Sequence, residues 1–181
     1  MKNQRITEAM LQFIEESPTA FHAAANVEAL LLENGFEKLE NLAEGALVPG
    51  GSYYTMQNGS AVLAVKIPEN PAKGFRIAAS HSDSPCFKIK EVPEMKVENT
   101  YVKLNVEKYG GMILSPWLDR PLSVAGRVFV AGKDGKPEAK LVNLKKDLLI
   151  IPNVAIHFNR EINNGFAYNP QTDMAPLMGL D

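Results

Sequence analysis

The sequence predicts an α/β fold followed by a β-rich segment, and three observations support this fold class. Two stretches near the start place apolar residues at helical spacing. An apolar run then leads directly into His81, as expected for a buried strand. Beyond Pro93, short alternating stretches follow one another without long helices between them, which is typical of a β-rich domain.

Two helices are predicted first. Residues 6–15 form one amphipathic stretch, which Pro18 ends. Its apolar positions at helical spacing are Ile6, Met10, Phe13 and Ile14. Residues 19–34 form the second helix, and Gly35 follows where a C-terminal cap is expected. Within it, His22 is expected to be an ordinary surface or packing residue.

Strands are predicted next. Residues 52–56 and 60–67 alternate around Asn58-Gly59, which is a strong hairpin turn signal. The run 75–80 is apolar and β-compatible, so it predicts a buried strand. Its carboxyl end carries His81, and open α/β sheets bind their ligands at the carboxyl ends of strands.

The pair His81 and Asp83 is the main candidate for chemistry. A metal-bound imidazole commonly donates its second ring N–H to a carboxylate. The spacing of two residues can place both groups on one side of an extended segment. The alternative is a hydrogen-bonded structural histidine. Nearby, Cys86 is either a buried small hydrophobe, which we favour, or a thiol close to a metal.

The second half of the chain predicts consecutive strands. Residues 91–94 indicate a boundary, so we expect one domain over 1–92 and a second over 93–181. Strands are expected over 102–106 and 124–130, followed by a turn over 132–137. The stretch Trp117-Leu118-Asp119-Arg120 is expected to be a buried aromatic residue beside an ion pair.

Composition excludes several classes of function. The chain has 181 residues with 45% apolar content, which is enough to bury a core. Its net charge of −2 gives no electrostatic case for binding nucleic acid. No apolar stretch reaches the ~18 residues of a membrane span, and the N-terminus lacks a signal-peptide pattern, so we expect a cytoplasmic protein without a membrane partner. The single cysteine cannot form an internal disulfide.

Several ordered segments resemble the aspartyl aminopeptidase family. The stretch His81-Ser82-Asp83-Ser84-Pro85 and the residues up to 90 are similar to the family's metal-binding segment. Further similar segments cover residues 17–23, 34–36, 53–54, 58–60, 109–111, 117–120, 122–128 and 151–160. The resemblance therefore extends over nearly the whole chain.

This resemblance implies a function. It predicts a zinc-exopeptidase α/β domain followed by part of an inserted oligomerisation domain, and hence a homo-oligomer. The implied activity is removal of N-terminal residues, acidic ones in particular, from a peptide substrate with the help of two zinc ions. His81 is implied as a metal ligand, and Asp83 as a catalytic residue that either orients His81 or lies close to the metals. His157 is a second metal candidate, with a hydrogen-bonded core histidine as the alternative.

The resemblance also implies that the chain is an N-terminal fragment. Family members are more than twice as long, and their glutamate general base lies beyond the position of Asp181. We therefore expect these residues to be inactive alone, and the alternative function is a non-catalytic truncated oligomerisation module. The runs 75–80 and 148–151 are too apolar to stay exposed, so we also expect association through them.

Overall fold

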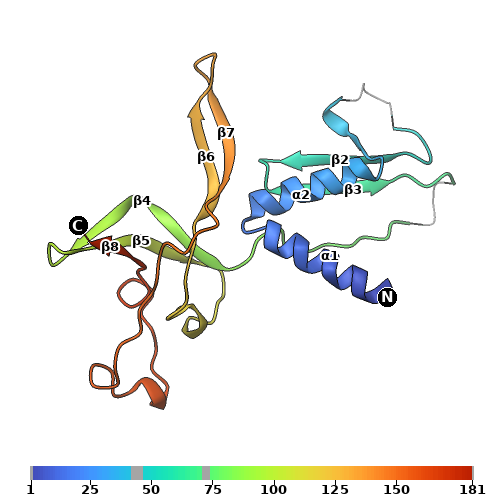
Figure 1. Cartoon of the computed structure of the whole chain (residues 1–181). Coiled ribbons are helices and arrows are strands. Elements are labelled where there is room, and N and C mark those ends of the chain that lie inside the picture. Colours follow the sequence, from blue (N-terminus) through green and yellow to red (C-terminus); the bar gives the residue numbers. More distant parts are fainter. Residues whose placement is uncertain (1, 42–46, 71–73, 181) are drawn as a thin grey trace. The chain divides into compact units, whose positions relative to one another are not determined.

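The structure, a computed structural model, describes residues 2–41, 47–70 and 74–180 and divides into two compact units (Figure 1). Unit 1 contains Met1–Ser84 and Ala125–Val142, and unit 2 contains Pro85–Val124 and Asn143–Asp181. This division differs from the expected boundary after residue 92. That position lies inside one long strand, where the pairing register shifts and the chain continues without a break.

The two helices of unit 1 confirm the expected pattern. Helix α1 spans Lys2–Glu16 and α2 spans Ala20–Glu33. Thr19 caps α2, since its hydroxyl accepts a hydrogen bond from the backbone N–H of His22. At the other end, Gly35 has a φ of +75°, the left-handed conformation that commonly ends a helix.

A three-stranded sheet accompanies these helices. It consists of β1 (Glu37–Lys38), β2 (Ser52–Gln57) and β3 (Ala61–Lys66), in the order β1-β2-β3. Strand β2 pairs parallel with β1 and antiparallel with β3. Asn58 and Gly59 both have positive φ, as a two-residue hairpin turn requires, so the predicted hairpin is confirmed. The short 3-10 helix η1 (Leu39–Asn41) follows β1.

A separate hairpin belongs to unit 1. Strands β6 (Ala125–Ala131) and β7 (Pro137–Asn143) form a two-stranded sheet. Arg127 attaches the hairpin to the rest of the unit. Its Nη1 donates to the Asn58 carbonyl at 2.7 Å, and its guanidinium lies 4.0 Å from the centre of the Phe21 ring.

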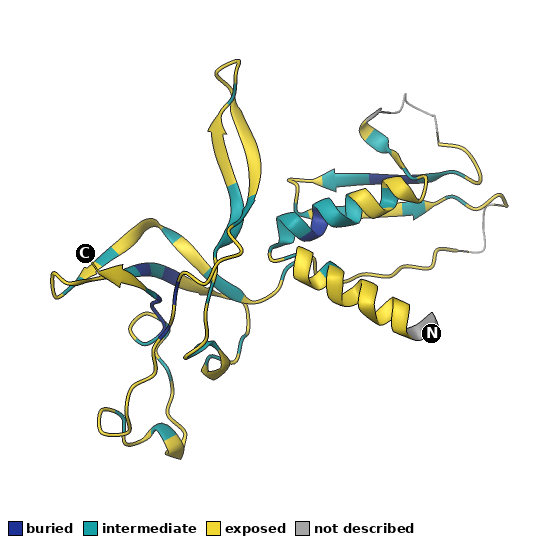
Figure 2. Cartoon of the chain, in the orientation of Figure 1, coloured by how far each residue is buried: buried dark blue, intermediate teal, exposed yellow. Residues whose placement is uncertain are grey.

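Unit 2 is built on a second three-stranded sheet. Strands β4 (Cys86–Val97), β5 (Tyr101–Tyr109) and β8 (Leu177–Leu180) lie in the order β4-β5-β8, all antiparallel to their neighbours. The core of this unit joins residues from the sheet and from later loops (Figure 2). Its buried members are Leu104, Val106 and Leu149, with Phe87, Leu122 and Val124 packed against them. Two 3-10 helices, η2 (Ser115–Trp117) and η3 (Ile162–Asn164), complete the unit.

The expectation for residues 75–80 is wrong. The run forms no strand, and the side chains of Phe75 and Ile77 are 81% and 87% exposed. A strand needs a neighbour to satisfy its backbone groups, and no strand in the described part of the chain pairs with this run. By contrast, the run 148–151 is partly buried within unit 2, with Leu149 and Ile151 in its interior, and association through this run stays a prediction. No helix among the described residues is long and apolar enough to cross a membrane.

Candidate metal centre at His81

The structure brings His81 and Asp83 into contact. The His81 Nδ1 lies 2.9 Å from the Asp83 Oδ1. Because an ionised carboxylate only accepts hydrogen bonds, this contact places the ring proton on Nδ1 and the imidazole lone pair on Nε2. The His81 side chain is 91% exposed and that of Asp83 is 31% exposed. The Asp83 carboxylate is thus the more buried member of the pair, and the His81 imidazole is largely open to solvent.

The segment between the two residues is also held in place. The Ser82 hydroxyl donates a hydrogen bond to the Ser60 carbonyl at 2.7 Å. Ser60 directly precedes β3, so this bond connects the His81 segment to the β2–β3 hairpin within unit 1. The backbone that carries the pair is therefore attached to the turn of the β2–β3 hairpin, although the preceding run is not itself a strand.

The pair fits part of a zinc site. One imidazole with an orienting carboxylate is a common arrangement around protein-bound zinc. Catalytic zinc typically takes three protein ligands and structural zinc takes four. The described residues contain no group of three or more His, Cys, Asp and Glu side chains that could hold a metal ion. His81 therefore suits the role of a single ligand and does not complete a site by itself.

His157 belongs to unit 2, whereas His81 belongs to unit 1. It occupies a turn and is exposed, so the alternative of a core histidine is wrong. The physical reason is that its flanking apolar residues are exposed too, including Ile156 and Phe158. Flanking apolar residues alone therefore do not predict burial here.

Asp119 positions the chain just before His157. Its backbone N–H donates to the Ile151 carbonyl at 2.9 Å, and its Oδ1 accepts from the Asn153 backbone N–H at 2.8 Å. Asp119 has a φ of +57°, a conformation that aspartate adopts more readily than most residues. The sequence pattern suggested an ion pair with Arg120, but the structure gives Asp119 a backbone-binding role.

Trp117 and Cys86 are both expected to be buried, and both are less buried than expected. Trp117 is half-buried, and its ring packs edge-on against Phe87 with 5.1 Å between centroids. Cys86 is half-buried at the start of β4, opposite Tyr109, which agrees only in part with the favoured buried position. The alternative of a thiol close to a metal stays untested for Cys86.

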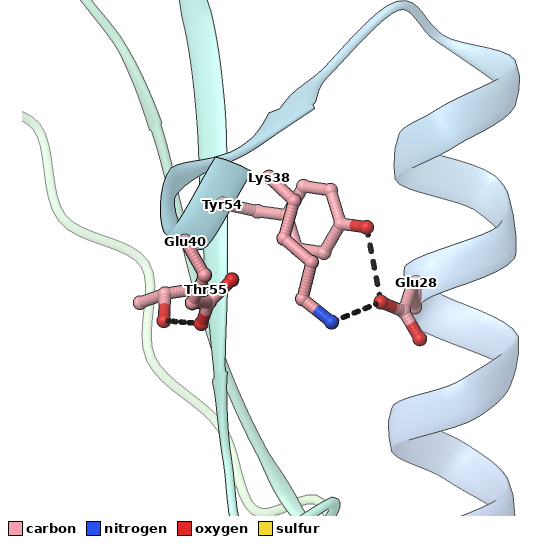
Figure 3. Close-up of polar contacts among 5 residues, drawn as sticks. All are labelled: Glu28, Lys38, Glu40, Tyr54 and Thr55. Atoms are coloured by element: carbon pink, nitrogen blue, oxygen red, sulfur yellow. Dashed lines mark hydrogen bonds and ion pairs between the residues drawn. The ribbon is translucent and has the colours of Figure 1, made fainter. Parts of the chain in front are cut away.

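A polar cluster that the sequence did not predict joins α2 to the sheet of unit 1 (Figure 3). The Glu28 Oε1 accepts hydrogen bonds from Lys38 Nζ at 3.1 Å and from the Tyr54 hydroxyl at 3.0 Å. Beside it, Thr55 donates to Glu40 at 2.6 Å. Glu28 and Tyr54 are 26 positions apart, so no local pattern reveals their contact.

The cluster shifts the pKa values of its members. The hydrogen bond to Glu28 and its charge raise the pKa of Lys38. Burial raises the pKa of Tyr54, and the hydrogen bond to Glu28 adds to this. The hydrogen bond from Thr55 lowers the pKa of Glu40. In α2, burial lowers the pKa of His22, whose Nδ1 lies 2.8 Å from the Thr19 hydroxyl.

Comparison with known proteins places this chain in a family of zinc metalloproteases. The family described as Aminopeptidase I zinc metalloprotease (M18) matches residues 13–181. The chain belongs to this M18 family, which confirms the resemblance seen in the sequence.

Individual relatives give the extent of the match. A probable M18 family aminopeptidase 2 of Clostridium acetobutylicum is 47% identical over 99% of this chain. The chain spans 42% of that relative's length. The solved structure of an Ape4 and Nbr1 complex matches with a TM-score of 0.86 and 38% identity, over 94% of this chain and 33% of the other. The S. cerevisiae mApe1 dodecamer, at 24% identity and a TM-score of 0.80, shares the fold over 98% of this chain and 39% of the other.

Proposed function

We propose that this chain is part of a zinc-dependent aminopeptidase to which it contributes His81 as a metal ligand. The observation that carries the proposal is the 2.9 Å contact between His81 and Asp83, in a chain that belongs to a zinc metalloprotease family. This contact gives the imidazole the tautomer that a metal ligand needs. Exposure of the ring leaves its Nε2 accessible to an ion and to further ligands.

Each residue has a distinct role in this proposal. When bound, zinc acidifies water and polarises the scissile carbonyl. His81 would hold zinc through Nε2, and Asp83 would keep the proton on Nδ1 and the ring in a fixed orientation. Asp83 is thus a positioning residue in this arrangement, in place of the catalytic role first expected for it. His157 is the second proposed ligand, and Asp119 would position the backbone that leads to it.

The finer points of the function follow from the family resemblance. We propose two zinc ions, a peptide substrate with an acidic N-terminal residue, a cytoplasmic location and a homo-oligomer. The dodecamer of the S. cerevisiae mApe1 supports the last point. The chain spans less than half of its Clostridium relative, so we assign the general base to none of the described residues and expect the 181 residues alone to be inactive.

The test compares the 181-residue chain with the polypeptide translated past the codon of Asp181. We expect the longer polypeptide to release aspartyl or glutamyl residues in a zinc-dependent reaction, and the shorter one to stay at background. In the longer polypeptide, His81→Ala should abolish zinc-dependent turnover. Asp83→Asn should lower metal affinity or activity by about 10–100-fold, the usual effect of removing an orienting partner. The exposed Gln57→Ala serves as the control and should change neither.

A second candidate function is a non-catalytic oligomerisation module. It is favoured by the absence of any group of three potential metal ligands from the described ranges. A stop codon directly after Asp181 and no zinc retained after dialysis against a mild chelator would support the module. Turnover by the homogeneous 181-residue protein that is lost in His81→Ala would contradict both the module and our assignment of the base.

A further inference from the structure

The β6–β7 hairpin has two unpaired edges within the described residues. Each of its strands has a single neighbour, since the sheet contains only these two strands (Figure 1). A two-stranded hairpin by itself is marginally stable in water. Its side chains are nevertheless partly apolar, with Phe129 63% exposed and Leu141 43% exposed. An additional strand would satisfy the free backbone groups and cover apolar surface.

The sequence of β7 is complementary to itself. Glu138 and Lys140 flank Ala139, and their charged groups lie 3.6 Å apart on one face of the strand. If two copies of β7 pair antiparallel around a two-fold axis at Ala139, each Glu138 lies opposite the partner's Lys140. Opposite charges that face each other across strands stabilise a sheet, and this register creates two such pairs.

The backbone supports the same register. The N–H of Gly132 donates to the carbonyl of Lys136 at 2.8 Å, which begins the pairing of β6 with β7. In a regular antiparallel ladder that continues from this bond, the backbone groups of Ala139 and Leu141 point away from β6. They are then available to a strand on the outer edge. Pro137 lacks an N–H, so the new ladder would be short and centred on Ala139.

We infer that the outer edge of β7 is an interface between two copies of this chain, paired antiparallel with the two-fold axis at Ala139. The charge pattern selects a second copy as the occupant, because another strand would need the inverse order of charges at the same spacing. This inference rests on the homo-oligomer proposed above and names one of its interfaces, but it does not depend on the peptidase activity. The alternative is that lysine and proline protect this edge from pairing, which is a common use of these residues.

A charge-reversal series tests the pairing by sedimentation velocity over a range of protein concentrations. Lys140→Glu would place two pairs of glutamates opposite each other, so we expect self-association to weaken about tenfold, which corresponds to about 1.4 kcal/mol. The double variant Glu138→Lys with Lys140→Glu restores the opposite charges and should associate like the wild type. Lys133→Glu, in the turn of the same hairpin, makes the same change in net charge and should have no effect.

A cysteine probe tests the register itself. In a Cys86→Ser background, Ala139→Cys places two thiols on the two-fold axis, with the Cα atoms about 5.5 Å apart as in a hydrogen-bonded antiparallel pair. That distance suits a disulfide. Leu141→Cys serves as the control, because the two copies of residue 141 would lie four residues apart along the strands, or about 14 Å. Mild air oxidation should cross-link only Ala139→Cys.

Two results on association, and one on cross-linking, would overturn the inference. One is a wild-type chain that stays monomeric at all concentrations tested. The other is a double charge variant that associates no better than Lys140→Glu. Equal cross-linking at both cysteine positions would likewise show that association does not use this register. Circular dichroism of each variant verifies that the hairpin variants remain folded.

Discussion

Two apolar runs have different fates in this structure. Residues 75–80 predict a buried strand, and both this run and the run 148–151 are too apolar to stay exposed without a partner. In the second run, Ile151 is fully buried and Leu149 nearly so. In the first run, Ile77 is 87% exposed and no strand forms. An apolar run therefore becomes buried only when the chain supplies a surface for it to pack against.

The second run has such partners on both sides. The Leu122 N–H donates to the Leu149 carbonyl at 2.9 Å, and the Leu177 N–H donates to the Ile150 carbonyl at 2.7 Å. These contacts satisfy the backbone while Leu149 joins the core of unit 2. The first run has no comparable neighbour in the described part of unit 1. The nearest hydrogen bond that holds it lies just beyond the run, where the Ser82 hydroxyl donates to the Ser60 carbonyl.

Hydrogen exchange should show the largest contrast between the two runs. The amides of Leu149 and Ile150 are hydrogen-bonded to Leu122 and Leu177. The structure gives residues 75–80 no backbone hydrogen bond with any described residue. We expect the amides of the second run to exchange at least about 10³-fold more slowly, since they open only with unit 2. Hydrogen exchange measured by NMR at single amides checks this prediction. Strong protection of residues 76–79 would show that the first run is also hydrogen-bonded in solution and would contradict it.

Truncating one isoleucine in each run gives the next largest effect. Ile151→Ala leaves a cavity in unit 2 and should lower the free energy of unfolding by about 2–5 kcal/mol. Ile77→Ala is the matched control and should change it by no more than about 0.5 kcal/mol. Urea unfolding followed by circular dichroism and by the fluorescence of Trp117 measures both. A loss above about 1 kcal/mol in Ile77→Ala would mean that the first run is buried against a partner in solution.

Removing one hydroxyl should have a smaller effect in the packed part of unit 1. Tyr54 is 1% exposed and donates to Glu28, so Tyr54→Phe keeps the packing and loses this hydrogen bond. We expect the melting temperature of unit 1 to fall by about 2–4 °C. Tyr101→Phe, at an exposed position, is the control and should melt like the wild type. An unchanged melting temperature in Tyr54→Phe would show that the cluster contributes no net stability.

The pH dependence of the same cluster should give the smallest effect. The folded pKa values of Tyr54 and Lys38 are both raised, so the folded state favours the protonated form of each group. Their contribution is fully present below the unfolded pKa, 10.0 for tyrosine, and is lost as the pH rises through the folded pKa. Urea unfolding from pH 8 to 11 should therefore show stability falling above about pH 10. Tyr54→Phe should flatten this decline, and an equally steep decline in the variant would count against the assignment.

Local signals determined much of the fold from the sequence alone. The left-handed Gly35, the Thr19 cap and the turn at Asn58-Gly59 depend on conformational preferences of a few neighbouring residues. The second helix and the first hairpin are therefore predicted to within one residue at each end, whereas the first helix begins at Lys2, four residues before its predicted start. The contact between His81 and Asp83 was predicted for the same reason, because two residues of separation fix their distance within one segment.

Contacts between distant segments were decided only by the tertiary structure. Nothing near Glu28 in the sequence identifies Tyr54 as its partner, and no local pattern assigns Asp119 to the backbone of Asn153. The same holds for burial, since Ile77 and Ile151 have the same side chain and opposite exposures. The sequence determined which residues prefer a strand or a turn, because those preferences are local. The tertiary structure decided which of them are buried, because burial requires a second surface that the residue itself does not specify.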